Sequence, residues 1–103
     1  MITLIHNPAC SKSREALALL QSRLPAASLQ VREYLQQPLD LVELKQLGLP
    51  ARELLRGEPD GRDDDALLGA IAANPELLQR PIVIRDGRAL IARPPELALT
   101  LLD

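Results

Sequence analysis

Aromatic residues are almost absent from this sequence of 103 residues, which contains no phenylalanine, no tryptophan and a single tyrosine, Tyr34. The core of the protein must therefore be built almost wholly from aliphatic side chains. An excess of positive charge is also absent, since 12 basic residues face 14 acidic ones and the net charge is −2. This balance argues against a nucleic-acid surface or a polybasic membrane face. No apolar run approaches the length of a membrane span.

Cysteine and histidine occur once each, as Cys10 and His6. A single cysteine excludes an internal disulfide framework, and no clusters with metal-ligand spacing are present, so we expect no metal site. The first apolar run is too short for an export signal and ends at His6 and Pro8, so we expect a cytoplasmic protein. Cys10 is then either a small buried hydrophobe or a reactive thiol.

Apolar spacing and turn residues predict a single domain over residues 1–103. A capping residue is expected at Asp40 and another in the acidic run 63–65, and Gly48 should end the helix that Asp40 begins. The dipeptide at 86–87, Asp-Gly, is a strong hairpin signal. The predicted elements are strands at 2–6 and 28–35, helices at 11–23, 41–48, 50–57 and 66–74, a further helical turn opened by Pro75, a β-hairpin at 81–93 and a helix at 94–102.

The order of these elements indicates the fold class. A strand, a helix and a second strand joined by a right-handed crossover give two parallel strands. The terminal hairpin then completes a mixed four-stranded sheet with helices on its faces. The order β-α-β … β-β-α is that of an α/β, thioredoxin-like fold with a helical insertion at about residues 40–80.

The position of Cys10 favours the reactive alternative. It falls at the N-cap or first turn of helix 11–23, where unpaired backbone N–H groups and the helix dipole stabilise a thiolate and lower its pKa. The same N–H groups would hold a tetrahedral oxyanion. We expect further hydroxyl donors from Ser11 and Ser13 and positive charge from Lys12 and Arg14.

Several separated motifs resemble the glutaredoxin-coupled arsenate reductase family. They are "HNPAC" at 6–10, "SR" at 13–14, "LLR" at 54–56, "RPIV" at 80–83 and "RPPE" at 93–96, and they run from end to end in the family's order. Ser11 and Lys12 replace a glycine and a threonine of the characterised reductases, which resembles an arsenate reductase-like branch. The family's thioredoxin-like fold with a helical insertion agrees with the element order above.

The resemblance implies roles for individual residues. Cys10 would be the nucleophile that attacks arsenate, and Arg56, Arg80 and Arg93 would bind the oxyanion, with their guanidinium groups converging near the sulfur. His6 matches the family's histidine upstream of the cysteine, where it would tune charge or orient the loop. The Arg80–Pro81 bond is expected to be cis. Ser13, Arg14 and Pro81 complete the predicted site.

The resemblance and the single cysteine together imply external reductants. No second internal thiol is available, so glutathione and glutaredoxin are the expected partners and no cofactor is expected to be bound. A chain of this size is expected to be a monomer.

Two other functions fit parts of the sequence. Relatives of this family bind RNA polymerase and use a Cys-x-x-Cys switch. Here the pattern is Cys10-x-x-Ser13, so that disulfide cannot form, and the three arginines would be unnecessary for such a role. A monothiol glutaredoxin-like carrier explains the Cys-x-x-Ser pattern but not the three arginines.

Overall fold

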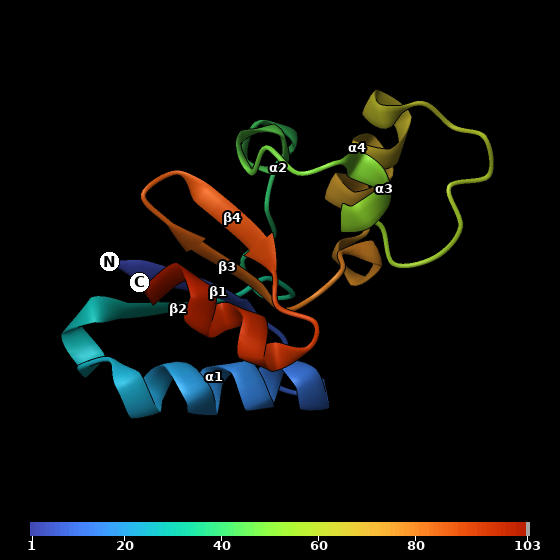
Figure 1. The fold of residues 1–103 in the computed structure, drawn as a ribbon. Coiled ribbons are helices and arrows are strands. Elements are labelled where there is room, and N and C mark those ends of the chain that lie inside the picture. The colour runs from blue at the N-terminus through green and yellow to red at the C-terminus, as the bar shows by residue number, and fades with distance from the viewer. Residues whose placement is uncertain (103) are drawn as a thin grey trace.

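A four-stranded mixed sheet forms the centre of the computed structural model, which describes residues 1–102 (Figure 1). The strands run in the order β2-β1-β3-β4. Together with the helices around it, this sheet makes an α/β, thioredoxin-like fold, as the sequence predicts. The strands are β1 (Ile2–His6), β2 (Leu29–Glu33), β3 (Ile82–Arg85) and β4 (Arg88–Ile91). The helices are α1 (Ser11–Arg23), α2 (Leu41–Gln46), α3 (Ala51–Leu54) and α4 (Asp64–Ala73), with 3₁₀ turns η1 (Ala26–Ser28), η2 (Pro75–Leu77) and η3 (Pro95–Leu102).

The strand directions follow from the connections. The crossover through α1 makes β1 and β2 parallel, while β3 is antiparallel to both β1 and β4. The turn between β3 and β4 has Asp86 at φ 51° and Gly87 at φ 77°. Two successive positive φ values are those of the primed turn that favours Asp-Gly. The predicted hairpin is therefore confirmed.

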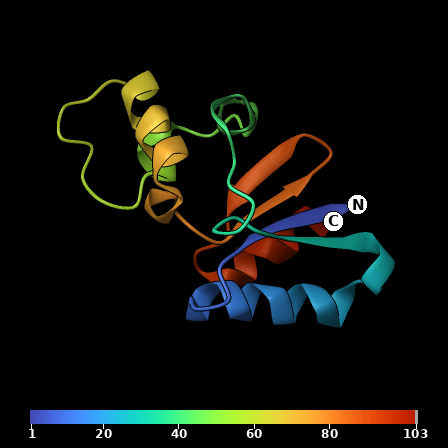
Figure 2. The same ribbon diagram turned by 180° about the vertical axis from the view of Figure 1, so that it is seen from behind.

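Two apolar layers lie on opposite faces of the sheet. The ribbon shows α1 running along one side of the sheet and α2 lying on the other (Figures 1 and 2). Because side chains alternate along a strand, Leu4 packs with α1 and η3, whereas its neighbour Ile5 packs with the helices of the insertion. Both layers are aliphatic apart from Tyr34, whose ring is fully buried in the layer that contains Ile5 and the helices of the insertion. β1 ends at His6 and α1 begins at Ser11, so the N-terminus of α1 lies at the end of the sheet where β1 finishes.

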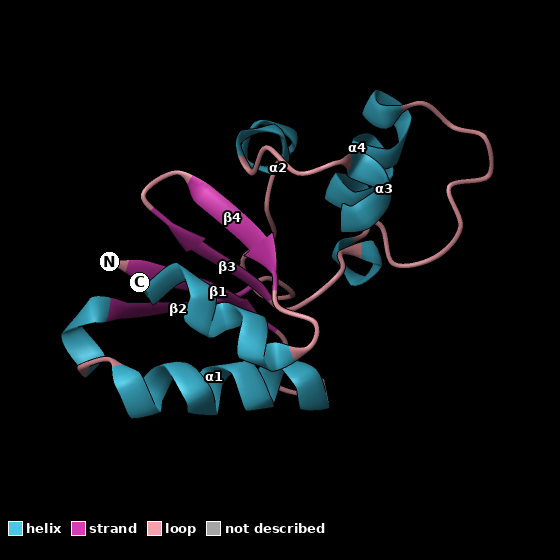
Figure 3. Cartoon of the chain, viewed as in Figure 1, coloured by secondary structure: helices cyan, strands magenta, loops and turns pink. Residues whose placement is uncertain are grey.

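The helical insertion runs from α2 to η2, and Figure 3 shows its cyan helices and pink loops beside the magenta sheet. Asp40 caps α2 through the Glu43 N–H at 2.8 Å, and Asp63 caps α4 through the Ala66 N–H at 2.8 Å. Both predicted caps are confirmed. No helix within residues 1–102 has the length and apolar character needed to cross a membrane.

Several predicted elements differ in the structure. The helix predicted at 41–48 ends at Gln46, and the helix predicted at 66–74 is α4, Asp64–Ala73. The second strand ends at Glu33 instead of residue 35, because the Glu33 carbonyl accepts the N–H groups of Gln36 and Gln37 and closes a turn. The helix predicted at 50–57 is a single turn, α3. The last helix is a 3₁₀ helix that starts at Pro95, with the Leu97 N–H bonded to the Pro94 carbonyl at 3.0 Å.

Candidate active site

Cys10 is the N-cap residue of α1, as the sequence predicts. Its backbone is extended, at φ −95° and ψ 123°, and its carbonyl accepts the Arg14 N–H at 3.0 Å, the first bond of the helix. The Cys10 side chain makes no capping hydrogen bond and is half-buried. The thiol therefore lies at the positive end of a 13-residue helix with a path to solvent.

The surroundings of Cys10 favour the thiolate. Burial by itself raises the pKa of the thiol, but the backbone N–H groups of Ser13 and Lys12 and the Arg80 guanidinium outweigh it. The net result is a pKa below the ordinary value. A thiolate is the nucleophilic form of cysteine, so these groups activate Cys10.

The Ser13 hydroxyl makes no hydrogen bond to the Cys10 thiol, contrary to our expectation. It lies 2.6 Å from His6 Nδ1 and accepts the Asn7 N–H at 2.9 Å, and the residue is fully buried. The reason is geometric: β1 points His6 toward the first turn of α1, where Ser13 faces the sheet. Only the backbone of Ser13 acts on Cys10.

His6 is buried at the end of β1. Burial lowers the pKa of its imidazole, Glu33 opposes this change and Arg14 adds to it. The net lowering favours the neutral ring at pH 7. His6 therefore ties β1 to α1 through Ser13, in agreement with an orienting role for the loop.

Arg80 is the arginine that the fold brings to the thiol. It is only 9% exposed, and its guanidinium donates to the carbonyls of Glu76 and Leu78 at 3.2 and 3.3 Å. The Arg80–Pro81 bond is cis, as predicted, and the Arg93–Pro94 bond is cis as well. Pro81 is buried at the start of β3.

Arg93 is joined to this corner through the backbone. Its guanidinium donates to the Arg80 carbonyl at 2.9 Å. The Arg93 side chain therefore contacts the backbone of Arg80 even though 12 residues separate the two in the sequence, but of the three predicted arginines only Arg80 acts on the thiol.

Arg56 reaches the same region through the insertion. Leu55 and Leu78 form an isolated antiparallel bridge, and the Arg56 N–H donates to the Leu77 carbonyl at 2.6 Å. The Arg56 side chain is exposed, and its charge acts on the buried hydroxyl of Tyr34. Because the bridge is antiparallel, Arg56 lies beside Leu77 and Arg80 follows the paired Gln79 at the opposite end, so the bridge fixes the backbone of both segments but does not bring the two guanidinium groups together.

The remaining predicted residues lie around the loop. Arg14 donates to the Pro8 carbonyl at 3.0 Å, which braces the loop. Lys12 is exposed and pairs with Glu15 at 3.9 Å on the outside of α1, and Ser11 is exposed. Within residues 1–102 no group of three His, Cys, Asp or Glu side chains is placed to hold a metal ion.

Two buried polar residues of the site were not predicted. Asn7 uses its side chain twice: Oδ1 accepts the Ala9 N–H at 2.9 Å, and Nδ2 donates to the Tyr34 hydroxyl at 3.1 Å. Its carbonyl accepts the Cys10 N–H at 3.0 Å. The signals were present in the sequence, because Asn7 belongs to the "HNPAC" motif and Tyr34 is the only aromatic residue.

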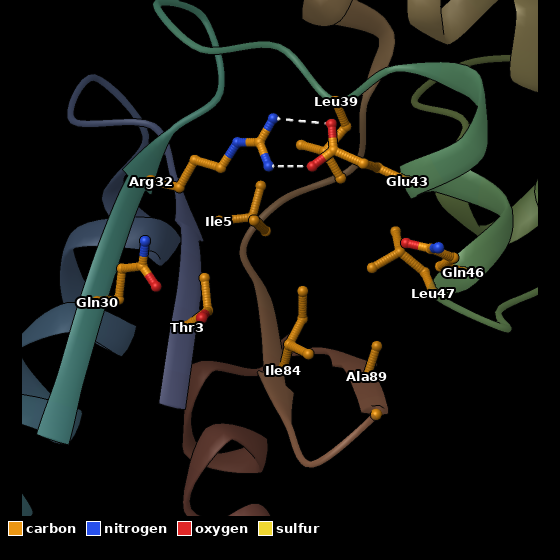
Figure 4. A pocket seen from close by; sticks show the side chains of 11 residues that line it. Thr3, Ile5, Gln30, Arg32, Leu39, Glu43, Gln46, Leu47, Ile84 and Ala89 are labelled. Carbon is orange, nitrogen blue, oxygen red and sulfur yellow. Dashed lines mark hydrogen bonds and ion pairs between the residues drawn. The ribbon is translucent and has the colours of Figure 1, made fainter. Parts of the chain in front are cut away.

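A separate hollow lies between the sheet and α2 (Figure 4). It encloses about 320 Å³, and none of the predicted site residues lines it. Figure 4 shows Arg32 and Glu43 pointing toward one another, and their paired contacts fasten β2 to α2. Arg32 also donates to the carbonyls of Gln37 and Pro38, so its donors are committed to the fold.

Comparison with known proteins agrees with this arrangement. The family model described as "ArsC family" matches residues 5–101. An arsenate reductase of Neisseria meningitidis is 47% identical, over 92% of each chain, and one of Haemophilus influenzae is 36% identical, over 98% of each. A solved arsenate reductase from Vibrio cholerae superposes with a TM-score of 0.85 at 40% identity, covering 96% of this chain and 95% of the other. With a family model that matches residues 5–101 and a relative that is 47% identical over 92% of each chain, the chain belongs to the ArsC family.

Proposed function

We propose that this chain reduces arsenate to arsenite, with Cys10 as the nucleophile. The observation that carries the proposal is the placement of Cys10 at the N-terminus of α1, where two N–H groups and Arg80 lower the pKa of its thiol. Relatives at 47% and 36% identity over nearly the full chain are arsenate reductases.

The buried guanidinium of Arg80 beside the thiol supports an anionic substrate. Arsenate carries two negative charges near neutral pH, so positive groups must hold it before an anionic sulfur approaches. Arginine suits this task because its planar fork binds an oxyanion through two hydrogen bonds and keeps its charge. We assign this role to Arg80, Arg93 and Arg56.

The chemistry proceeds in two stages. Cys10 sulfur forms a bond to arsenic, and one arsenic–oxygen bond breaks, its oxygen leaving as water after protonation by solvent. Two external thiols then supply two electrons, become joined in a disulfide, and release arsenite and the Cys10 thiolate. Overall, one arsenate and two thiols give one arsenite, one disulfide and one water.

The single cysteine supports an external source for these electrons. Cys10 is the only cysteine, so no internal thiol can resolve the adduct. We propose glutathione and glutaredoxin as the two thiol donors, acting on a monomer in the reducing cytoplasm.

Arsenite release measures this function directly. Purified protein with arsenate, glutathione and glutaredoxin is expected to produce arsenite, and C10S should produce none. Omitting glutaredoxin, or replacing both donors with thioredoxin, should greatly slow the reaction. Equal rates with thioredoxin would overturn the assignment of the donor. If arsenite is not released but a glutathionylated peptide is reduced, the protein is a monothiol carrier.

A further inference from the structure

The turn that carries Cys10 is built around the side chain of Asn7. Residues 7–10 form a β-turn in which the Asn7 carbonyl accepts the Cys10 N–H at 3.0 Å. Within this turn Asn7 Oδ1 accepts the Ala9 N–H at 2.9 Å, a bond that asparagine makes readily because its side chain reaches the N–H two residues on. The middle residues, Pro8 and Ala9, are exposed, whereas Asn7 is only 7% exposed. The turn is therefore held from inside by Asn7.

The other polar atoms of Asn7 connect this turn to its surroundings. Its N–H donates to the Ser13 hydroxyl at 2.9 Å, which joins the turn to α1. The Ala9 N–H can only donate, so the amide oxygen of Asn7 faces Ala9 and the amide nitrogen faces Tyr34. Nδ2 donates to the Tyr34 hydroxyl at 3.1 Å, and Tyr34 is fully buried. An exposed turn is thus fastened to the packed core by one side chain.

These contacts hold the backbone on both sides of Cys10. Its N–H is bonded to Asn7, and its carbonyl accepts the Arg14 N–H at 3.0 Å, so the residue keeps the extended conformation of an N-cap. In this conformation the sulfur interacts with the N–H groups of Lys12 and Ser13. The stabilisation of an anion by a helix N-terminus falls off within the first turn. A turn that relaxed would therefore weaken it.

The charged groups near the thiol act independently of Asn7. Arg80 is the charged side chain that acts on Cys10. Burial lowers the pKa of His6 and raises the pKa of Tyr34, so both are neutral at pH 7. Asn7 is itself uncharged, and a change of the Cys10 pKa in an alanine variant would report the placement of the sulfur. The other cationic side chains of the first turn of α1 have partners elsewhere: Lys12 pairs with Glu15, and Arg14 bonds the Pro8 carbonyl.

We propose that Asn7 is a positioning residue for the nucleophile: by bonding the Ala9 N–H and the Tyr34 hydroxyl, its side chain holds the 7–10 turn in the form that presents the Cys10 sulfur at the start of α1. This inference rests on the proposed function, in which Cys10 attacks arsenate. Asn7 transfers no proton in this role. It keeps the thiolate aligned before the anion arrives, so that alignment adds nothing to the barrier of the reaction.

The first test is the pH dependence of Cys10 alkylation in N7A. Its midpoint should rise toward that of the unfolded chain, because the sulfur is no longer held against the N–H groups of α1. We expect kcat/KM for arsenate to fall by about ten- to a hundredfold, mostly through kcat, since the groups that bind the anion remain.

The matched control is D63A, which removes a side-chain-to-backbone bond of the same kind from α4. It should lower the free energy of unfolding and leave both the midpoint and the kinetics unchanged. An unchanged midpoint in folded N7A, or an equal rise in D63A, would overturn the proposal.

Two further variants separate the two bonds of the Asn7 side chain. In N7S a serine can still accept the Ala9 N–H but cannot reach Tyr34. Y34F keeps the buried ring and the Ala9 bond and removes only the acceptor of Nδ2. N7A should raise the midpoint less in the Y34F background than in the unchanged protein. If N7A does not fold, these variants decide: a raised midpoint in either supports the proposal, and an unchanged midpoint in both overturns it.

Alkylation requires no arsenate, so this inference and the proposed function fail separately. If the unchanged protein releases no arsenite, the proposed function fails, but a raised midpoint in N7A still supports the positioning role of Asn7. If arsenite is released and N7A keeps both the midpoint and the kcat of the unchanged protein, the role of Asn7 fails alone.

Discussion

Single residues of this site divide into those that act on the thiol and those that hold the loop. Arg80 and the N–H groups of Lys12 and Ser13 act on Cys10. His6 and the Ser13 hydroxyl hold the loop to the helix. The sequence predicted the residues of both groups. It assigned the Ser13 hydroxyl to the thiol, whereas this hydroxyl holds the loop. Spacing along a chain does not determine which neighbour a short side chain bonds when strand and helix offer partners at similar distance.

Arg80 gives the first prediction. R80A should raise the alkylation midpoint of Cys10 and lower kcat/KM for arsenate by about ten- to a hundredfold, since a charged hydrogen-bond donor is lost. R80K should recover only part of the activity, because lysine restores charge without the planar fork. R88A, which removes an exposed arginine of the hairpin, is the control. Unchanged kinetics and an unchanged midpoint in R80A would contradict the assignment.

Ser13 gives the second prediction. S13A leaves His6 Nδ1 and the Asn7 N–H without their shared partner in a buried place. It should therefore lower the free energy of unfolding by about 1–3 kcal/mol, measured with urea. S11A changes an exposed serine and should stay within about 0.5 kcal/mol. A stable S13A protein with a clearly raised thiol pKa would show that the hydroxyl serves Cys10 after all.

Among the elements, those with local signals were predicted well. The bounds of β1 and α1 agree with the sequence, and the caps at Asp40 and Asp63 and the Asp86–Gly87 turn are confirmed. Each of these depends on neighbouring residues only. The early end of β2 depends instead on how its turn meets α2, where Arg32 holds two turn carbonyls and Glu43. Such a contact cannot be inferred from strand periodicity.

Replacing each of two glycines by alanine tests the backbone conformation assigned to the β3–β4 turn and to α4. Gly87 has a positive φ and Gly69 lies within α4, and an added Cβ would meet no atom within 4 Å at either position. G87A should destabilise the protein by about 1–2 kcal/mol, the cost of the left-handed conformation. G69A should stabilise it by about 0.5–1 kcal/mol, because alanine favours a helix. Urea unfolding measures both, and changes of the same sign would contradict the assigned backbone conformations.

For the whole molecule, the order of elements predicted the fold class, since a crossover and a hairpin leave few ways to build one sheet. The meeting of Cys10 and Arg80 could be expected only by resemblance to known reductases. The insertion returns to the sheet through the Leu55–Leu78 bridge, which no local pattern reveals. The site is consequently a property of the assembled fold, formed by a loop, a helix start and two distant segments.

The activation of Cys10 by this assembled fold is the central claim, and alkylation with iodoacetamide tests it most directly. The rate is measured against pH for the native protein and for the protein unfolded in urea. The unfolded chain should show the midpoint of an ordinary thiol, about 8.5. The native protein should show a midpoint clearly below that value, because the helix N–H groups and Arg80 outweigh burial. A native midpoint equal to or above the unfolded one would contradict the account.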